Sequence, residues 1–406
     1  MIASFAKRKE VTAKESIRTF RIAARMLVSR YIRRLGSRLP RREGPVRILF
    51  DAHNGMHLVC LRPVIDALMA VPNVRVALMN SWERSRAPAR ELFAGFGYAD
   101  DLVVAPNLRT RWRRWDVYVC ASHASTRRSW LWQGTPRVYA EHGVSGARHP
   151  DAKWWELRED LLPAYAAVFI TGELFMPRAK QQAGRIGYGD APRLVGFPKL
   201  DRLVNGPLDG EAVRARLGLD RSRPTVMLAP TWSHWSLAGS AYDFDEILTM
   251  LAREARYNVL LKLHHLSRVS TKDNWSARLK TYLEHPNFRL IDDPDALPYL
   301  LVSDALITDH STIGFEYAVL DRPLFQYDHP NVVYDPPEVR QMCEEAAYRF
   351  RHPRELRVLL ERGLAQPSER SAARRALARA CFYNCGTATE RAVAILLDLA
   401  SGKSRY

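Results

Sequence analysis

The sequence predicts an α/β protein of two domains, each built around a parallel sheet. The chain has 406 residues, enough for two or three domains at roughly 150 residues each. Hydrophobic residues make up 47% and charged residues 26% of it, a globular balance that excludes disordered, collagen-like and disulfide-framework proteins. Short apolar runs alternate with helical patterns, which is typical of βαβ units.

The first set of apolar runs begins after Gly44-Pro45 and predicts the strands of one domain. Its first strand, at 46–50, leads into a helical pattern at 57–70. The other strands predicted for this domain are 74–79, 101–105, 117–121, 137–142, 167–172 and 193–198.

A segment rich in Gly, Pro, Asp and Arg at 202–222 interrupts this pattern, which then restarts. We therefore divide the chain into a basic arm at 1–44, a first domain at 45–205 and a second domain at 206–406, whose last forty residues are predicted to be helical. Ligands bind at the carboxyl ends of the strands in such sheets, so we expect a cleft between the domains. The strands predicted for the second domain are 225–231, 258–264, 288–292, 305–309 and 323–328.

The net charge of +17 is concentrated in the arm, where thirteen Lys and Arg stand against three Glu. Apolar residues recur there at steps of three or four, which predicts a basic amphipathic helix. Such a helix fits an anionic membrane surface, whereas the alternative is a helix packed on the protein's own core. A nucleic-acid partner is not expected, because no recognised motif accompanies the charge. The apolar positions are Ile17, Phe20, Ala24, Leu27, Tyr31 and Leu35.

The lack of a secretory signal and of a transmembrane run, together with the scattered cysteines, favours a cytoplasmic protein, peripheral on the inner face of the cell membrane. No run of about 18 apolar residues predicts a transmembrane helix, and the arm lacks the features of a secretory signal, although a mitochondrial transit peptide remains open. Five scattered cysteines suit a reducing compartment.

A second basic-aromatic cluster, at 109–115 and 127–132, fits a membrane interface and a half-buried domain surface equally well.

Polar residues follow three predicted strands of the second domain and should converge at one edge of its sheet. They are Thr231, then Lys262 and His264, then the segment 308–314. This last segment opens a helix, so its backbone N–H groups and hydroxyls predict an anion site, strengthened by the nearby Lys and His. The alternative is plain N-capping by Ser311 or Thr312, with Glu316 completing a box-like pattern. Neither a P-loop nor a GxGxxG fingerprint is present.

In the first domain, His142 follows a predicted strand and precedes a glycine, so it could face the cleft as a general base. The alternative is a histidine hydrogen-bonded at the domain surface. Asp51, His53 and His57 are weaker candidates for acceptor binding. We expect no metal, because the adjacent His264 and His265 would point to opposite faces of a strand and no carboxylate spacing supports a metal site. We also expect no cofactor.

Five segments, in order, resemble the CDP-glycerol glycerophosphotransferase family, the teichoic-acid primases and polymerases. The resemblance covers residues 45–395, and its last segment is the most specific. The segments are EHG at 141–143, GFPKLD at 196–201, LAPTW at 228–232, LLKLHH at 260–265 and SDALITDHSTIGFEYAVLDRPLFQYD at 303–328.

This resemblance implies two Rossmann-like domains in the GT-B arrangement. It implies a transferase that moves glycerol phosphate, or a related polyol phosphate, from a CDP-linked donor to an acceptor hydroxyl in cell-surface polymer synthesis, releasing CMP. By analogy His142 is the general base. Lys262, His264, Ser311 and Thr312 would hold the donor phosphates, and Thr231, Asp309 and Glu316 would line the donor pocket.

Departures from the family pattern keep other functions open. His265 replaces the usual Pro, His310 and Thr312 replace Tyr and Ser, and only Arg148 or Lys153 could replace the Lys that usually follows HG. The alternatives are a GT-B glycosyltransferase using a nucleotide sugar, a nucleotide-sugar 2-epimerase-like enzyme and a non-catalytic membrane-associated assembly protein. The acceptor could be a polyprenyl-linked sugar, a growing polyol-phosphate chain or a capsular glycan.

Overall fold

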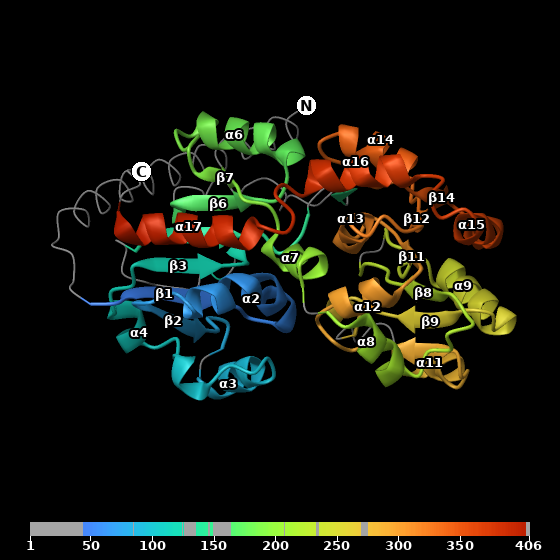
Figure 1. Cartoon of the computed structure of the whole chain (residues 1–406), viewed down its shortest axis with the longest axis horizontal. Helices are drawn as coiled ribbons and strands as arrows, with labels where there is room; N and C mark the ends of the chain where they lie inside the picture. The colour runs from blue at the N-terminus through green and yellow to red at the C-terminus, as the bar shows by residue number, and fades with distance from the viewer. Residues whose placement is uncertain are drawn as a thin grey trace, which may run out of the picture.

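The protein contains two parallel six-stranded sheets, one in each domain (Figure 1). The structure is a computed structural model that describes residues 44–83, 85–123, 125, 135–144, 147–148, 164–206, 208–232, 235–268 and 275–402. The predicted helix of the basic arm, the second half of the basic-aromatic cluster and Lys153 lie outside the described residues.

The first sheet has the order β2-β1-β3-β4-β6-β7, and all of its strands are parallel. Every residue of β3 and β6 is buried, as expected of strands covered by helices on both faces. These six strands confirm six of the seven predicted for this domain. Their bounds are β1 Val46–Asp51, β2 Val74–Met79, β3 Val117–Cys120, β4 Arg137–Ala140, β6 Ala167–Ile170 and β7 Pro192–Leu194.

The strand predicted at 101–105 is wrong. The chain forms the 3-10 turn η1 (Asp100–Leu102) there, and Val103 makes only an isolated bridge to Leu78. Three residues further on, Pro106 has no N–H to donate to a ladder, so the apolar run is too short to pair. Trp115, from the basic-aromatic cluster, is buried, and its indole N–H donates to the Thr110 carbonyl at 2.9 Å.

The helices of the first domain alternate with its strands. The longest, α2, begins after Asn54, whose side chain accepts the His57 N–H at 2.9 Å as an N-cap. The helical segments are α2 Gly55–Met69, α3 Ala87–Ala94, α4 Leu108–Trp112, η4 Glu173–Phe175, α6 Met176–Arg185 and α7 Pro198–Val204.

The second sheet has the order β10-β9-β8-β11-β12-β14. This is the strand order 3-2-1-4-5-6 of dinucleotide-binding domains, with its switch point between β8 and β11. The five predicted strands are confirmed, and β14 is an edge strand that sequence analysis missed because it has only three residues. The bounds are β8 Thr225–Leu228, β9 Asn258–Leu261, β10 Phe288–Leu290, β11 Ala305–Thr308, β12 Leu324–Tyr327 and β14 Tyr348–Phe350.

Helices cover both faces of this sheet as well (Figure 1). The core against them includes Phe244, Ile247 and Leu248 from α9. The helices are α8 Gly210–Leu217, α9 Ala241–Glu254, α10 His265–Arg268, α11 Trp275–Leu283, α12 Leu297–Val302, α13 Thr312–Ala318, α14 Glu338–Ala346, α15 Pro353–Ala365 and α16 Ser371–Cys381.

The last helix, α17 (Ala388–Ser401), crosses back to the first domain and packs against α2 and α7. Ala392, Leu396 and Leu399 belong to the core of the first sheet. This differs from the expectation that residues 206–406 form the second domain alone, because an amphipathic pattern does not reveal which sheet a helix covers. The short strands β5 (Ala147–Arg148) and β13 (Val333–Tyr334) also join the two parts of the chain, as an antiparallel pair.

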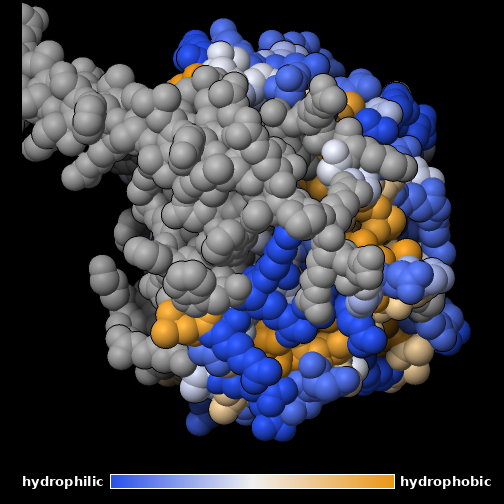
Figure 2. All heavy atoms as spheres, turned by 90° about the vertical axis from the view of Figure 1, so that its left-hand side faces the viewer, coloured by the Kyte–Doolittle hydropathy of each residue, from blue (hydrophilic) through white to orange (hydrophobic). Residues whose placement is uncertain are grey.

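The described surface at the first-domain end is mainly hydrophilic, with hydrophobic side chains exposed between hydrophilic ones (Figure 2). Within the described ranges, no helix has the length and apolar character needed to cross a bilayer.

Candidate active site between the two sheets

The carboxyl ends of the two sheets meet at Gly143 and Thr312. The Thr312 hydroxyl donates to the carbonyl of Val144 at 3.1 Å, joining the loop after β4 to the start of α13. A Cβ atom on Gly143 would lie 2.8 Å from Thr312 Oγ1. The loop that carries His142 therefore needs glycine at 143 to approach the second domain this closely.

His142 is held in a tautomer that suits a general base. Its Nδ1 lies 2.6 Å from the carbonyl oxygen of Ala121, and since a carbonyl only accepts, Nδ1 carries the proton. Nε2 is then the basic atom. Burial lowers the pKa of His142, and the positive form of His265 would lower it further. The ring is therefore neutral at physiological pH and able to take a proton.

His57 lies behind His142, with 4.8 Å between the ring centroids. It is 3% exposed, and burial holds its pKa far below the ordinary value, so it stays neutral. Asp51, another weak candidate, is fully buried and accepts from the Tyr118 hydroxyl at 2.6 Å and the Ser81 N–H at 3.0 Å. Its carboxylate organises the loops after the strands and is not exposed to a ligand.

On the second domain, His264 is held in the opposite tautomer. Its Nδ1 accepts the N–H of Leu266 at 3.2 Å, which leaves the proton on Nε2. Burial lowers the pKa of His264 to about 3, with further contributions from His265, Lys262 and His142. Through this contribution the candidate base, His142, influences the candidate phosphate-binding residue His264 electrostatically.

The expectation that His264 and His265 point to opposite faces of a strand is wrong. Strand β9 ends at Leu261 and α10 begins at His265, so the two residues are not on a strand, and their ring centroids are 4.3 Å apart. Lys262 donates to the carbonyl of Asp293. In this structure the Lys262 ammonium therefore contacts the loop after β10.

Asp309 holds the loops of the donor side together. It is 1% exposed, and its carboxylate accepts the N–H groups of Thr231 at 3.0 Å, Leu237 at 3.1 Å and Ser311 at 3.1 Å. Burial raises its pKa in spite of these donors. Asp309 therefore fixes the segments after β8 and β11 from within. Thr231 and Ser311 are half-buried, and the Ser311 side chain makes no capping bond to its helix.

Glu316 pairs with Lys199 across the domain contact. The ammonium of Lys199 lies 2.7 and 2.9 Å from the two carboxylate oxygens, and the residues are 8% and 3% exposed. Burial alone would lower the pKa of Lys199, but the negative charge of Glu316 raises it above its ordinary value. The alternative that Glu316 completes a capping pattern is therefore wrong, because its carboxylate is paired with Lys199.

The GFPKLD segment, at 196–201, connects the first domain to α13 and to the start of α17. Besides Lys199, it supplies Asp201, whose carboxylate accepts the N–H of Gly386 at 2.8 Å and both the N–H and the hydroxyl of Thr389 at 2.6 Å. These bonds hold the start of α17. Sequence analysis identified the segment but missed both residues, although two charges flanking the apolar Leu200 were a signal.

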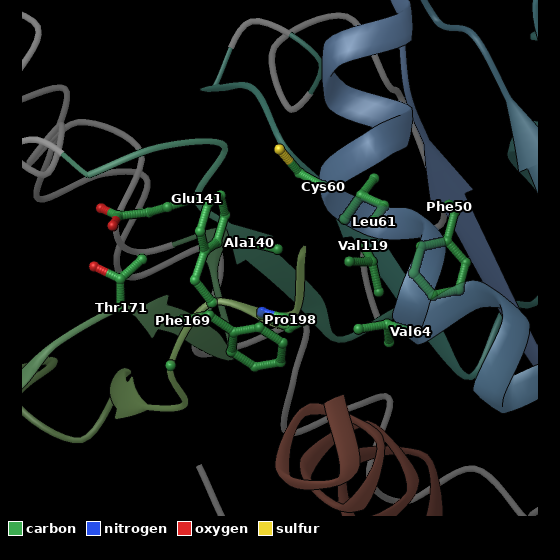
Figure 3. A pocket seen from close by; sticks show the side chains of 12 residues that line it. Phe50, Cys60, Leu61, Val64, Val119, Ala140, Glu141, Phe169, Thr171 and Pro198 are labelled. Atoms are coloured by element: carbon green, nitrogen blue, oxygen red, sulfur yellow. The ribbon is translucent and has the colours of Figure 1, made fainter. Parts of the chain in front are cut away.

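Glu141, immediately before His142, lines a small cavity with Thr171 and with apolar residues of α2 and the first sheet (Figure 3). Burial raises the pKa of Glu141 to about 8, and the Thr171 hydroxyl is buried without a partner. The largely apolar lining is unsuited to a diphosphate, so this cavity is not the donor site.

The chain belongs to the CDP-Glycerol:Poly(glycerophosphate) glycerophosphotransferase family, whose model matches residues 188–398, just over half of the chain. It is 29% identical over 151 residues to a teichoic acid poly(glycerol phosphate) polymerase of Staphylococcus epidermidis, a match that covers 35% of this chain and 20% of the relative. It is 28% identical over 142 residues to a teichoic acid glycerol-phosphate transferase of Staphylococcus aureus, covering 32% and 34% respectively. The chain thus spans about a fifth to a third of these relatives' length.

Solved structures with the same fold cover nearly the whole chain. A variant of the wall teichoic acid polymerase TagF aligns with a TM-score of 0.61 at 16% identity, covering 96% of this chain and 98% of that one. The UDP-GlcNAc 2-epimerase of Neisseria meningitidis aligns with a TM-score of 0.58 at 14% identity, covering 87% and 100%. These similarities confirm the predicted fold of two α/β domains.

Proposed function

We propose that the protein transfers a polyol phosphate, with glycerol phosphate as the first candidate, from a CDP-linked donor to an acceptor hydroxyl and releases CMP. The observation that carries this proposal is the contact between the loop of His142 and the start of α13, which brings together the two sheet edges on which His142 and His264 lie. One basic nitrogen and one N–H donor are available there, in a chain of this family.

In the proposed reaction the acceptor oxygen attacks the phosphorus that bears the polyol. A new P–O bond forms, the bond from that phosphorus to the oxygen of CMP breaks, and CMP leaves with the electron pair. The acceptor proton passes to Nε2 of His142. Positioned donors that neutralise the charge developing on the diphosphate provide the main electrostatic stabilisation.

The donor phosphates would contact Nε2–H of His264, the ammonium of Lys262 and the hydroxyl of Ser311. Lys262 would have to leave the Asp293 carbonyl, and Thr312 would have to leave the Val144 carbonyl, before either could bind phosphate. Thr231 would line the donor pocket from the end of β8. Asp309 and Glu316 act as supports for the donor loops and for the domain contact.

The acceptor would be lipid-linked or polymeric, and the protein would work at the inner face of the cell membrane. Support for this comes from the sequence, because the net charge of +10 on residues 1–44 suits an anionic membrane surface. An N-terminal truncation lacking residues 1–44 should lose binding to anionic vesicles and keep CDP binding.

A donor panel of CDP-glycerol, CDP-ribitol and UDP-sugars, incubated with membrane extract, tests the reaction through nucleotide release. CMP released from a CDP-polyol, and lost in a His142→Ala variant, would support the proposal. Release of UDP from a UDP-sugar, with no CMP from either CDP-polyol, would contradict it and favour a glycosyltransferase.

A further inference from the structure

The amino ends of the strands in the first sheet form the edge opposite the candidate active site, and the described part of the basic-aromatic cluster lies there. β3 begins at Val117, directly after the cluster residues 109–115, whereas His142 follows the carboxyl end of β4. Figure 1 shows α4 at the end of this sheet that faces away from the second domain. The proposed reaction does not use this edge.

The segment around α4 is anchored by a buried tryptophan and presents other side chains to solvent. The Trp115 indole N–H donates to the Thr110 carbonyl at 2.9 Å, and the guanidinium of Arg113 lies 5.3 Å from the centre of the indole ring. Arg109 and Arg113 are exposed, and Leu108 is 70% exposed. A leucine this exposed beside exposed arginines is typical of a segment that enters the headgroup boundary of a bilayer.

Two further arginines extend this basic surface across the neighbouring strands. The Asp116 carboxylate accepts the Arg47 N–H at 2.7 Å, and the Asp116 N–H donates to the Arg47 carbonyl at 2.9 Å, which joins the α4 segment to β1. Arg47 is in turn the register partner of Arg75 on β2. Like charges on neighbouring strands repel each other, and neither guanidinium makes an ion pair with a residue that the structure describes. An anionic partner would relieve this repulsion.

The basic arm joins the first domain at the same edge. Residues 1–44 carry a net charge of +10, and the described chain begins at Gly44, just before β1. Met69, at the end of α2, is 47% exposed and lies near this edge, because the carbonyl of Asn73 accepts the Val46 N–H at 2.8 Å. Figure 2 looks onto this end of the molecule and shows hydrophobic side chains exposed between hydrophilic ones.

We infer that this edge, together with the arm, docks on the surface of an anionic lipid bilayer. Its arginines would contact lipid phosphates, and its two exposed apolar side chains would enter the headgroup boundary. A soluble polyanion would use the arginines but would leave the apolar side chains in water, so their presence favours a bilayer. We name this surface the amino-edge patch, which consists of Arg47, Met69, Arg75, Leu108, Arg109 and Arg113.

The patch adds to the arm and does not replace it, because stable anchoring generally takes two signals. The loss of vesicle binding expected when residues 1–44 are removed therefore agrees with a patch that is weak on its own. This inference shares the membrane location with the proposed function, but it does not depend on the proposed reaction.

Sedimentation of the full chain with vesicles tests the patch. Vesicles of phosphatidylcholine alone are compared with vesicles of phosphatidylcholine and phosphatidylglycerol in equal parts. Arg109→Gln/Arg113→Gln should weaken binding to the anionic vesicles roughly 25-fold, since each arginine near such a surface contributes about fivefold. Leu108→Ser should weaken binding about tenfold, and this loss should persist at high salt, which screens the arginines.

The matched control variant lies on α15 of the second domain. Arg354→Gln/Val358→Ser removes an exposed arginine and a valine that is 66% exposed, and it should leave vesicle binding unchanged. Arg109→Lys/Arg113→Lys keeps the charge and should bind nearly as well as wild type. If the melting temperature shows that Arg109→Gln/Arg113→Gln does not fold, Arg75→Gln takes its place, with about fivefold weaker binding expected.

Equal binding of the anionic vesicles by wild type and Arg109→Gln/Arg113→Gln would overturn the inference, as would an equal loss of binding in the control variant. Heparin is the soluble polyanion used for comparison. Tighter binding of heparin than of the anionic vesicles, unaffected by Leu108→Ser, would also overturn the inference and assign the arginines to a soluble polyanion.

CMP release separates this inference from the proposed function. With a soluble acceptor, Arg109→Gln/Arg113→Gln should release CMP at the wild-type rate, because the patch lies at the opposite edge of the sheet from His142. Weaker vesicle binding by this variant, in a protein that releases no CMP from any CDP-polyol, would support the patch and contradict the proposed function. CMP release with unchanged vesicle binding would do the reverse.

Discussion

The imidazoles of His142 and His264 are fixed in opposite tautomers by the backbone. Nδ1 of His142 donates to the carbonyl of Ala121, whereas Nδ1 of His264 accepts the N–H of Leu266. One ring is left with a basic nitrogen and the other with an N–H. A reaction that removes a proton from one oxygen and stabilises negative charge on another needs this pair of groups.

Removing the imidazole of His142 should abolish most turnover and spare donor binding. We expect His142→Ala to lower the rate of CMP release by about 10²–10⁴, the typical contribution of a general base. Calorimetry should show the same CDP affinity as wild type, because the ring belongs to the first domain. Near-normal CMP release would refute the role of His142 as base.

Donor binding should take up protons. His264 is neutral in the free protein because its pKa is about 3, and a bound diphosphate would favour its charged form and raise that pKa. Binding then tightens as pH falls toward the raised pKa. Titrations of CDP in two buffers of different ionisation enthalpy would measure the uptake. His264→Gln should abolish it, and an uptake that persists in this variant would show that another group titrates.

Acid should destabilise the protein through its buried histidines, whereas Glu141, whose pKa is raised to about 8, contributes in the opposite direction over the same pH range. The pKa values of His57, His142 and His264 are all lowered in the folded chain, so below the ordinary value of about 6.5 the unfolded chain binds more protons. Above about pH 6.5 these histidines are neutral in both the folded and the unfolded chain, so they do not reduce stability. Below it, the free energy of unfolding falls progressively. Melting temperatures between pH 7.5 and 5.5 would measure this decline, and His57→Asn should flatten it. An unchanged slope in His57→Asn would contradict the assignment to His57.

The ion pair between Lys199 and Glu316 should behave as a unit. Breaking a buried pair from one side leaves an uncompensated charge, so Lys199→Met and Glu316→Gln should each cost about 3–5 kcal/mol of stability. The Lys199→Met/Glu316→Leu double variant should recover much of this loss. Thermal unfolding of the four proteins gives the coupling, and strict additivity would argue against a shared role at the domain contact.

Gly143→Ala should separate the loop of His142 from α13. The added Cβ would lie 2.8 Å from Thr312 Oγ1, closer than the contact tolerates, so CMP release should fall. Thr312→Ala in the same protein removes the clashing hydroxyl and should restore part of the activity. Thr312→Ala alone is the control for loss of the Val144 bond. No rescue in the double variant would show that the backbone itself requires glycine.

Much of the architecture was predictable because buried parallel strands are short apolar runs, such as those ending at Asp51 and Thr308. The run ending at Ala105 gave the same signal and failed, since a nearby proline limits pairing. The residues at strand ends were predictable in kind, because topology brings those ends together. The direction in which each of these side chains points was not predictable. Asp309 and Glu316 stand beside a phosphate-type loop in the sequence, yet one turns inward to three backbone N–H groups and the other to Lys199.

The return of α17 to the first sheet has a consequence for synthesis on the ribosome. Leu396 and Leu399 complete a core whose last strand, β7, ends at Leu194, about two hundred residues earlier. Until α17 is synthesised, the nascent first domain exposes the apolar face that these leucines cover, and we expect it to be prone to aggregation during that time. A chain interrupted before residue 388 would leave that face of the first domain uncovered, and we expect it to be a target for degradation.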